Sequence, residues 1–211
     1  VNAHHPPANM LAFTSTAAAV LAFATVSVRA QAVPEMANAT EIALVEAQYE
    51  ASGFDTALPE SQSFNIPLNA TALLTVVYGN ETVVNGAPYT ATQVATKPTI
   101  HVTPETAQGY SSEDLFTLML ADASAVGQAD PEGDYRHYLS NSIAGGASAN
   151  NLSFVLGNGT VVTSYAGPGP LVNSGVHRYA WLLFQQPSNF SAPANLSTAG
   201  VAPGHWSVES Y

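Results

Sequence analysis

Apolar residues gather in six short segments between residues 73 and 185, and their spacing predicts β-strands. The expected strands span residues 73–78, 99–103, 115–120, 137–143, 161–165 and 178–185. Turn-forming pairs such as Asn85-Gly86 and Asp130-Pro131 separate them. Because the strands follow one another without intervening helices, the pattern favours a mainly β fold, an antiparallel β-sandwich with long loops.

One segment ahead of these strands, residues 38–54, has apolar residues at helical spacing, namely Ile42, Val45 and Tyr49. Asn38 stands where a helix N-cap is expected, and Glu41 follows three residues later as its capping partner. Gly53 is placed to end the helix. The sequence therefore predicts an N-terminal helix before the sandwich.

The segment 115–120 is apolar almost throughout, so we expect this strand to be buried on both faces. Asp122 follows it closely. A carboxylate at the end of a buried strand is costly unless it is paired or hydrogen-bonded, which makes Asp122 a candidate site residue. The alternative interpretation is a simple turn residue at the end of a strand.

The chain from Met10 onward reads MLAFTSTAAAVLAFATVSVRAQA, an apolar stretch that ends in small residues. This composition is typical of a secretory signal peptide. Residues 1–31 are therefore predicted to be a leader, and residues 38–211 to form the domain. The alternative is a buried N-terminal helix.

Composition narrows the range of partners. Charged residues make up 9% of the chain, the net charge is −11, and there are 4 Lys and Arg in total. Phosphate neutralisation needs many basic side chains, so nucleic acid is not an expected partner, and strong binding to anionic membranes is not expected either. The chain has no cysteine, so it contains no disulfide.

Asn-x-Ser/Thr sequons are frequent, and none has proline in the middle position. They lie at Asn38, Asn69, Asn80, Asn151, Asn158, Asn189 and Asn195. Glycans at these positions would supply solubility that the few charged side chains do not. Together with the leader, the sequons predict a secreted, extracellular glycoprotein.

Two motifs carry a resemblance to a known family. Gly-x-Gly-Pro at 167–170 precedes Gly-x-His-Arg-Tyr at 175–179, and upstream stand Asp122, His137 and Asn141. With these motifs the chain resembles the phosphatidylethanolamine-binding protein (PEBP) family, also called the Raf kinase inhibitor protein family, and looks most like its secreted fungal members. Family members usually continue beyond the equivalent of Tyr211, so the C-terminal segment is expected to be truncated.

The resemblance implies a sandwich with a small pocket for a phosphate-like anion at one end. The positions that it assigns to this pocket are Asp122, Ser124, His137, Gly167, Gly169, Pro170, His177 and Tyr179. The chain departs from the family pattern at Ser124 and Val126, where an acidic residue and a proline are usual. Expected ligands are phosphate, phosphoethanolamine or a phospholipid head group.

Elementary chemistry supports such a pocket. Two imidazoles can donate N–H groups to an anion, and Asp122 can fix the tautomer of one of them. Strand neighbours point to opposite faces, so Arg178 should face away from His177, and we expect it to form an ion pair near the sheet surface. For His177 the alternative is a histidine that is hydrogen-bonded within the core.

Other functions remain open at this point. A second family role is inhibition of a serine carboxypeptidase or another protease through a loop or the N-terminal segment. A hydrolase triad from Ser124, His137 and Asp122 is conceivable, but the chain has no Gly-x-Ser-x-Gly motif. Asp122, His137 and His177 are suitable metal-ligand types without a short ligand-spacing motif. We expect no enzyme, no cofactor and no metal.

Overall fold

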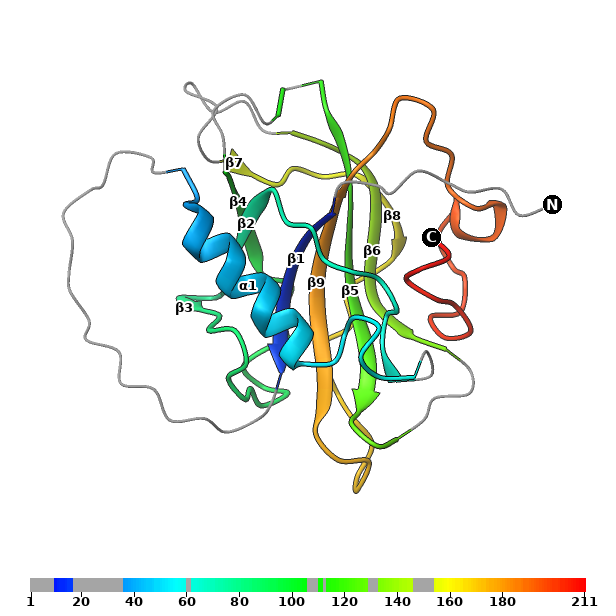
Figure 1. Ribbon diagram of the computed structural model, residues 1–211. Helices are drawn as coiled ribbons and strands as arrows, with labels where there is room; N and C mark the ends of the chain where they lie inside the picture. The colour runs from blue at the N-terminus through cyan, green and yellow to red at the C-terminus, as the bar shows by residue number, and fades with distance from the viewer. Residues whose placement is uncertain are drawn as a thin grey trace.

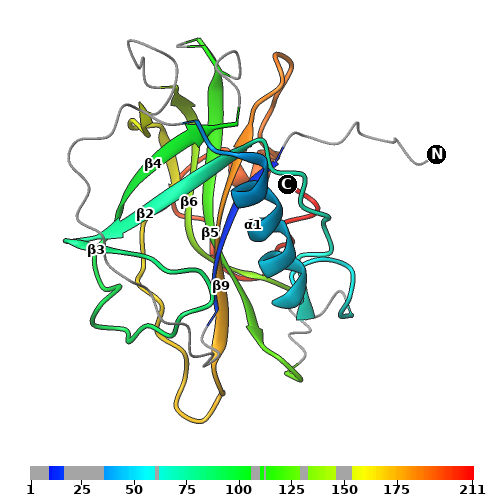
Figure 2. The same cartoon turned by 60° about the vertical axis from the view of Figure 1, so that its left-hand side comes forward.

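The structure is a computed structural model that describes residues 10–16, 36–59, 62–105, 110–111, 113–128, 133–145 and 154–211, with only the backbone of 10–16. Two antiparallel β-sheets face each other, and one helix lies beside them (Figure 1). Figure 2 shows the strands of the smaller sheet crossing those of the larger one. The expected mainly β sandwich with an N-terminal helix is confirmed.

The larger sheet has the order β1-β9-β5-β6-β8 and the smaller sheet the order β3-β2-β4-β7. The strands of the larger sheet are β1 (Met10–Thr16), β5 (Leu115–Ala125), β6 (Tyr135–Ala144), β8 (Thr160–Thr163) and β9 (His177–Gln185). Those of the smaller sheet are β2 (Ala72–Tyr78), β3 (Glu81–Thr82), β4 (Thr99–Pro104) and β7 (Phe154–Val155). All six predicted strands are present, and the two-residue strands β3 and β7 were not predicted.

Strand β1 occupies the start of the segment that the sequence identifies as a signal peptide. It pairs with β9 along its whole length, from Met10 opposite Phe184 to Thr16 opposite Arg178. Residues 10–16 thus form a strand rather than part of the buried helix considered as the alternative. It also precedes the predicted domain range of 38–211. The rest of the predicted leader, apart from 10–16, lies outside the described residues, and its removal stays a prediction.

Helix α1 (Ala39–Ala51) begins as the sequence predicts. The side chain of Asn38 accepts a hydrogen bond from the Glu41 N–H, and the Glu41 carboxylate accepts one from the Asn38 N–H. This reciprocal capping box stabilises the first turn. The helix ends at Ser52, directly before Gly53, whose φ of 65° favours glycine.

Side chains that alternate between the two faces of β5 and β9 contribute to two hydrophobic cores. On one face, Leu118, Leu120 and Trp181 pack between the two sheets. On the other, Met119 and Leu182 pack under the end of α1 and the segments that follow it, together with the C-terminal segment. Both faces of β5 are therefore buried, as its apolar sequence predicts.

The C-terminal segment is attached to the larger sheet through Arg136 on β6, which is buried. Its guanidinium donates to Thr163 Oγ1 at 3.2 Å and to the carbonyl of Ala202, and it lies 5.0 Å from the ring centre of Trp206. This interaction holds the last residues against the second core. Among the described helices, none has the length and apolar composition needed to cross a membrane.

Candidate functional site

At one end of the larger sheet, two β-bulges set the orientation of the polar side chains. In the β5–β9 pair, Asp122 faces Tyr179 and Ala125 faces His177, so β5 holds one extra residue between these pairs. Ser124 within this bulge has a left-handed φ of 59°. A bulge bends its strand and redirects the neighbouring side chains. Here it brings Asp122 to His177.

The second bulge lies in β6. Leu120 pairs with Tyr138 and Ala121 pairs with Arg136, so His137 is the extra residue. A regular strand would point His137 away from the face that Tyr138 occupies. The bulge instead turns its ring toward Asp122 and places it against the ring of Tyr179, 5.2 Å between centres. The sequence offers no direct sign of either bulge.

One carboxylate oxygen lies at the centre of this cluster. Asp122 Oδ2 is 2.9 Å from His177 Nδ1 and 3.7 Å from His137 Nε2. The other oxygen, Oδ1, accepts the N–H of Ser124 at 2.7 Å. Burial would raise the pKa of Asp122, but the two histidines and this backbone N–H outweigh it and hold the pKa below its ordinary value.

The phenol of Tyr179 completes the cluster. Its ring stacks beside that of His177, with centres 6.2 Å apart, because residues two apart on a strand share a face. Burial, together with the charge and the proximity of the Asp122 carboxylate, raises the pKa of Tyr179, so its hydroxyl stays protonated. The residue is 8% exposed, and its hydroxyl has no hydrogen-bond partner among the described residues. A buried donor without a partner is costly, so this hydroxyl is available to a water molecule or a ligand atom.

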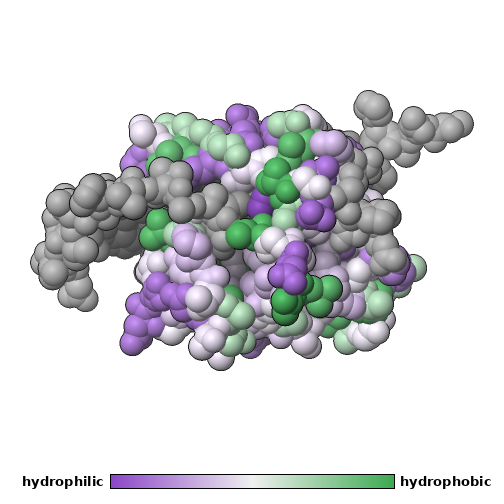
Figure 3. All heavy atoms as spheres, turned by 90° about the horizontal axis from the view of Figure 1, so that it is seen from below, coloured by the Kyte–Doolittle hydropathy of each residue, from purple (hydrophilic) through white to green (hydrophobic). Residues whose placement is uncertain are grey.

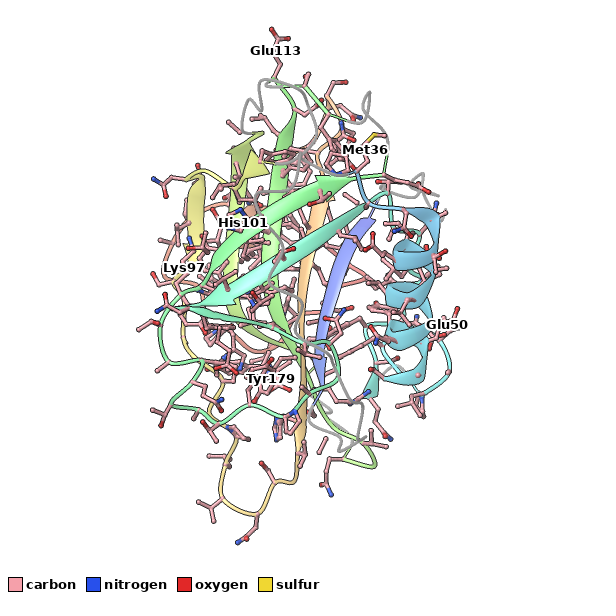
Figure 4. The ribbon with its side chains drawn as sticks, turned by 90° about the vertical axis from the view of Figure 1, so that its left-hand side faces the viewer. Met36, Glu50, Lys97, His101, Glu113 and Tyr179 are labelled. Atoms are coloured by element: carbon pink, nitrogen blue, oxygen red, sulfur yellow. The ribbon has the colours of Figure 1, made fainter. Side chains whose placement is uncertain are left out.

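A cavity of about 440 Å³ opens beside His177 and Tyr179. Its wall is largely apolar and includes Tyr78, Tyr89, Val94 and Trp181. Figure 4 shows Tyr179 at this end of the sandwich, far from His101 on β4. Figure 3 views the molecule from this end, where separate hydrophobic groups lie among hydrophilic ones.

The glycine-proline turn at 167–170 has two different roles. Gly169 and Pro170 line the cavity, as the resemblance implies. Gly167 does not, but a Cβ at this position would lie 2.8 Å from the Val94 carbonyl oxygen. Gly167 is therefore required for the close packing of this turn against the segment around Val94.

Of the two positions that depart from the family pattern, Ser124 acts through its backbone. The Ser124 N–H donates a hydrogen bond to Asp122, and its carbonyl accepts one from Arg178. Ser124 is not part of the cavity wall. Val126 is exposed. Asp122, His137 and Gly167 also lie behind the wall rather than in it. The residues of the predicted pocket that line the cavity are Gly169, Pro170, His177 and Tyr179.

The predicted ion pair of Arg178 is wrong. Arg178 does face away from His177, but it is buried, and among the described residues no carboxylate pairs with it. Its guanidinium binds main-chain carbonyls of three separate segments instead, those of Ser52, Gly53, Gln62, Ala123 and Ser124. Burial lowers the pKa of Arg178, and the charges of Asp122 and Asp134 oppose that shift. Arg178 therefore fixes the bulge that carries Asp122.

One residue near the cavity was missed in the sequence. Ser174 Oγ lies 2.9 Å from His177 Nε2 and 2.7 Å from the Leu171 carbonyl oxygen. The only sign in the sequence is a serine three residues before a motif histidine. Within the described residues, no group of three or more His, Asp or Glu side chains is arranged to hold a metal ion.

Comparisons with known proteins agree with this architecture. The family profile described as Phosphatidylethanolamine-binding protein matches residues 64–208. A relative from Saccharomyces cerevisiae, the uncharacterized protein YLR179C, is 34% identical over 127 residues. That match covers 57% of this chain and 62% of the relative, so it spans less than two thirds of the yeast protein.

A solved structure shares the fold. It is the crystal structure of carboxypeptidase Y inhibitor complexed with the cognate proteinase, and it superposes with a TM-score of 0.56 at 22% identity. The superposition covers 78% of this chain and 86% of the other. At this identity the likeness concerns the fold alone.

The fold and the polar cluster at its end define a binding protein of the β-sandwich type. The chain belongs to the phosphatidylethanolamine-binding protein family. The family is described by a binding role, and the structural neighbour is described as an inhibitor, so neither description assigns a catalytic activity.

Proposed function

We propose that this protein binds a phosphate-like anion in the cavity beside His177 and Tyr179. The observation that supports this most directly is the buried Tyr179 hydroxyl, a protonated donor without a partner among the described residues. The imidazoles of His137 and His177 lie next to it and are positively charged when protonated, while their ring nitrogens face Ala166, Asp122 and Ser174. An anion in the cavity would accept a hydrogen bond from the Tyr179 hydroxyl, and the charge of the protonated imidazoles would attract it.

The charge of the cluster makes this binding depend on pH. The titratable groups that face one another are Asp122 on β5, His137 on β6, and His177 and Tyr179 on β9. Asp122 contributes −1, so the cluster is positive only when both imidazoles are protonated. Arg178 lies on the opposite face of β9 and cannot replace them. Mild acid therefore favours anion binding.

The shape of the cavity favours an anion attached to an organic group. A volume of about 440 Å³ exceeds that of a phosphate ion, and the wall beyond the cluster is largely apolar. Phosphoethanolamine and a phospholipid head group share the phosphate that the cluster would recognise. The apolar wall would then contact the carbon atoms next to it.

An NMR titration of the histidine side chains tests the proposal. Phosphate and phosphoethanolamine should shift the His137 and His177 signals and leave those of His101, on the smaller sheet, unchanged. His137→Gln should weaken binding about tenfold, the effect of losing one nearby positive charge. The matched variant His101→Gln should bind like the wild type.

The proposal fails if millimolar phosphate and phosphoethanolamine leave both signals unchanged, or if binding strengthens with rising pH. A response to phosphoethanolamine alone would identify the organic group as part of the ligand. An equal response to both would assign recognition to the phosphate.

A carboxypeptidase partner is a second candidate. The structural neighbour that shares this fold is a carboxypeptidase Y inhibitor in complex with its proteinase. A dose-response assay against a secreted serine carboxypeptidase tests this role. Inhibition that survives His137→Ala would place the inhibitory surface outside the pocket, whereas no inhibition at micromolar protein would reject the candidate.

Secretion is part of the same proposal. The asparagines of six sequons are exposed in the described residues, and Asn151 lies outside them. Expression in a glycosylating host should yield a secreted chain whose mass falls after enzymatic removal of N-glycans. A chain that stays inside the cell with the leader attached would contradict this.

A further inference from the structure

We propose that Ser174 is a nucleophile that the His177–Asp122 pair activates toward carboxylic esters with a small apolar acyl group. This adds a covalent step to the binding role proposed above, and it rests on geometry that is independent of anion binding. The hydrolase triad weighed from the sequence used Ser124 and His137. In the structure it is Ser174 and His177 that align with Asp122.

Three side chains lie in line. Asp122 Oδ2 is 2.9 Å from His177 Nδ1, and His177 Nε2 is 2.9 Å from Ser174 Oγ. The carboxylate fixes the tautomer that carries hydrogen on Nδ1, which leaves Nε2 of the neutral ring as an acceptor. An imidazole in this state can take the proton of a serine hydroxyl, as in serine hydrolases.

The hydroxyl of Ser174 has a choice of acceptors. It also lies 2.7 Å from the Leu171 carbonyl oxygen, which accepts its hydrogen in one rotamer of the O–H bond. Rotation about the Cβ–Oγ bond transfers the hydrogen bond to His177 Nε2 when the ring is neutral. When the ring is protonated, Nε2–H donates to Oγ and the serine is not activated.

Ser174 directly precedes the residues of this loop that line the cavity and is not itself in the wall. Its neighbours Asn173 and Gly175 both have left-handed φ angles, 68° and 88°, and both are exposed. Ser174 itself is half-buried. Gly175, Val176 and His177, the residues that follow it, line the cavity. The proposed ester would place its acyl group in the cavity and its carbonyl carbon next to Oγ.

The cavity also offers what a developing oxyanion needs. The Tyr179 hydroxyl is protonated and has no partner among the described residues, so it can donate to the carbonyl oxygen. The largely apolar wall, with Val94 and Trp181, suits a short hydrocarbon chain. A charged acyl group would lose hydration there without gaining a partner.

The covalent step balances without a further reagent. Ser174 Oγ forms a bond to the carbonyl carbon, and the hydroxyl proton passes to His177 Nε2. The bond from that carbon to the alcohol oxygen then breaks, and the departing alkoxide takes the proton from Nε2. The products are an acylated Ser174 and a free alcohol.

The test uses p-nitrophenyl butyrate and a fluorophosphonate probe on the full chain. The ester should release about one equivalent of p-nitrophenolate per chain in a burst. Peptide mass spectrometry should find the butyryl and phosphonyl groups on Ser174. The labelling rate should rise with pH, because only a neutral imidazole accepts the serine proton, opposite to the pH dependence of anion binding.

Variants separate this proposal from anion binding. Ser174→Ala should abolish labelling and keep the phosphate-induced shift of His177, which also shows that the variant is folded. Asp122→Asn should slow labelling at least tenfold, because the tautomer of His177 is no longer fixed. Ser188→Ala, an exposed serine outside the cavity, should label like the wild type.

Labelling that persists in Ser174→Ala, or a wild-type chain that binds phosphate but is labelled by neither reagent, would overturn the proposal. Labelling of Ser174 in a chain that ignores phosphate would support the nucleophile and reject the anion site.

Discussion

Asp122 and His177 lie on neighbouring strands and are joined by a hydrogen bond of 2.9 Å at the point where β5 bulges. The bond connects the family motif around 175–179 to the end of the buried strand β5. His137, from the third strand, reaches the same oxygen at 3.7 Å. Three strands thus contribute to one charged cluster.

The Asp122 carboxylate should stabilise the fold at neutral pH and lose that effect in acid. Its pKa is lowered in the folded protein, so its contribution is present above the unfolded value of about 3.9 and disappears as pH falls through the lower folded value. Asp122→Asn should lower the free energy of unfolding by about 2 kcal/mol at neutral pH. Urea unfolding at neutral pH and near pH 3 checks this. An equal loss at both pH values would contradict it.

The two glycines of the turn before β9 should respond differently to alanine. A Cβ on Gly167 would lie 2.8 Å from the Val94 carbonyl oxygen, so Gly167→Ala should lower the free energy of unfolding by about 1–3 kcal/mol. A Cβ on Gly169 meets nothing closer than 3.8 Å, so Gly169→Ala should change it by less than about 0.5 kcal/mol. Thermal melts of the two variants measure the contrast. If both alanine variants were equally destabilised, the contact with the Val94 carbonyl would not be the reason for the effect.

Even a conservative replacement of Arg178 should destabilise the fold. Arg178→Lys keeps the charge, but a single ammonium cannot reach carbonyls in three segments as the planar guanidinium does. We expect a loss of about 3 kcal/mol or more in the free energy of unfolding, because buried carbonyls lose their donors. Lys97→Met, at an exposed position where the ammonium donates one hydrogen bond to the Tyr138 hydroxyl, should cost about 1 kcal/mol. Chemical denaturation of both variants tests this, and an Arg178→Lys variant as stable as the wild type would refute the role of the guanidinium.

Ser124 should tolerate glycine but not a β-branched residue. Its φ of 59° lies in the left-handed region, which valine strongly disfavours. Ser124→Val should lower the free energy of unfolding by about 1–2 kcal/mol, whereas Ser124→Gly should be close to neutral. The same unfolding measurement distinguishes them. A stable valine variant would mean that the bulge rearranges.

The sequence predicts the strands and the helix well because both depend on local periodicity and caps. Residues 115–120 are apolar on both faces, and the structure buries both faces of β5. The two bulges escaped prediction, since each consists of one extra residue in a pairing between strands far apart in the chain. Without them His137 and Asp122 would not meet.

The sequence predicts those parts of the candidate site that depend on the side chains of the motif itself. Alternation correctly separates Arg178 from His177. The partners of Arg178 are main-chain carbonyls, which any residue supplies, so no sequence pattern identifies them. Ser174 was missed for a related reason. Its contact with His177 depends on the turn at 171–174, which places the Ser174 hydroxyl next to the ring at the start of β9.

The choice of carbonyl partners for Arg178 has a consequence for the behaviour of the protein in acid. Amide carbonyls do not ionise in the pH range in which proteins fold, so the contacts of Arg178 persist when carboxylates and imidazoles take up protons. The cluster around Asp122 changes its charge over that range. Protonation of both imidazoles would therefore change the charge of the cluster from negative to positive while the chain segments that Arg178 joins stay in place.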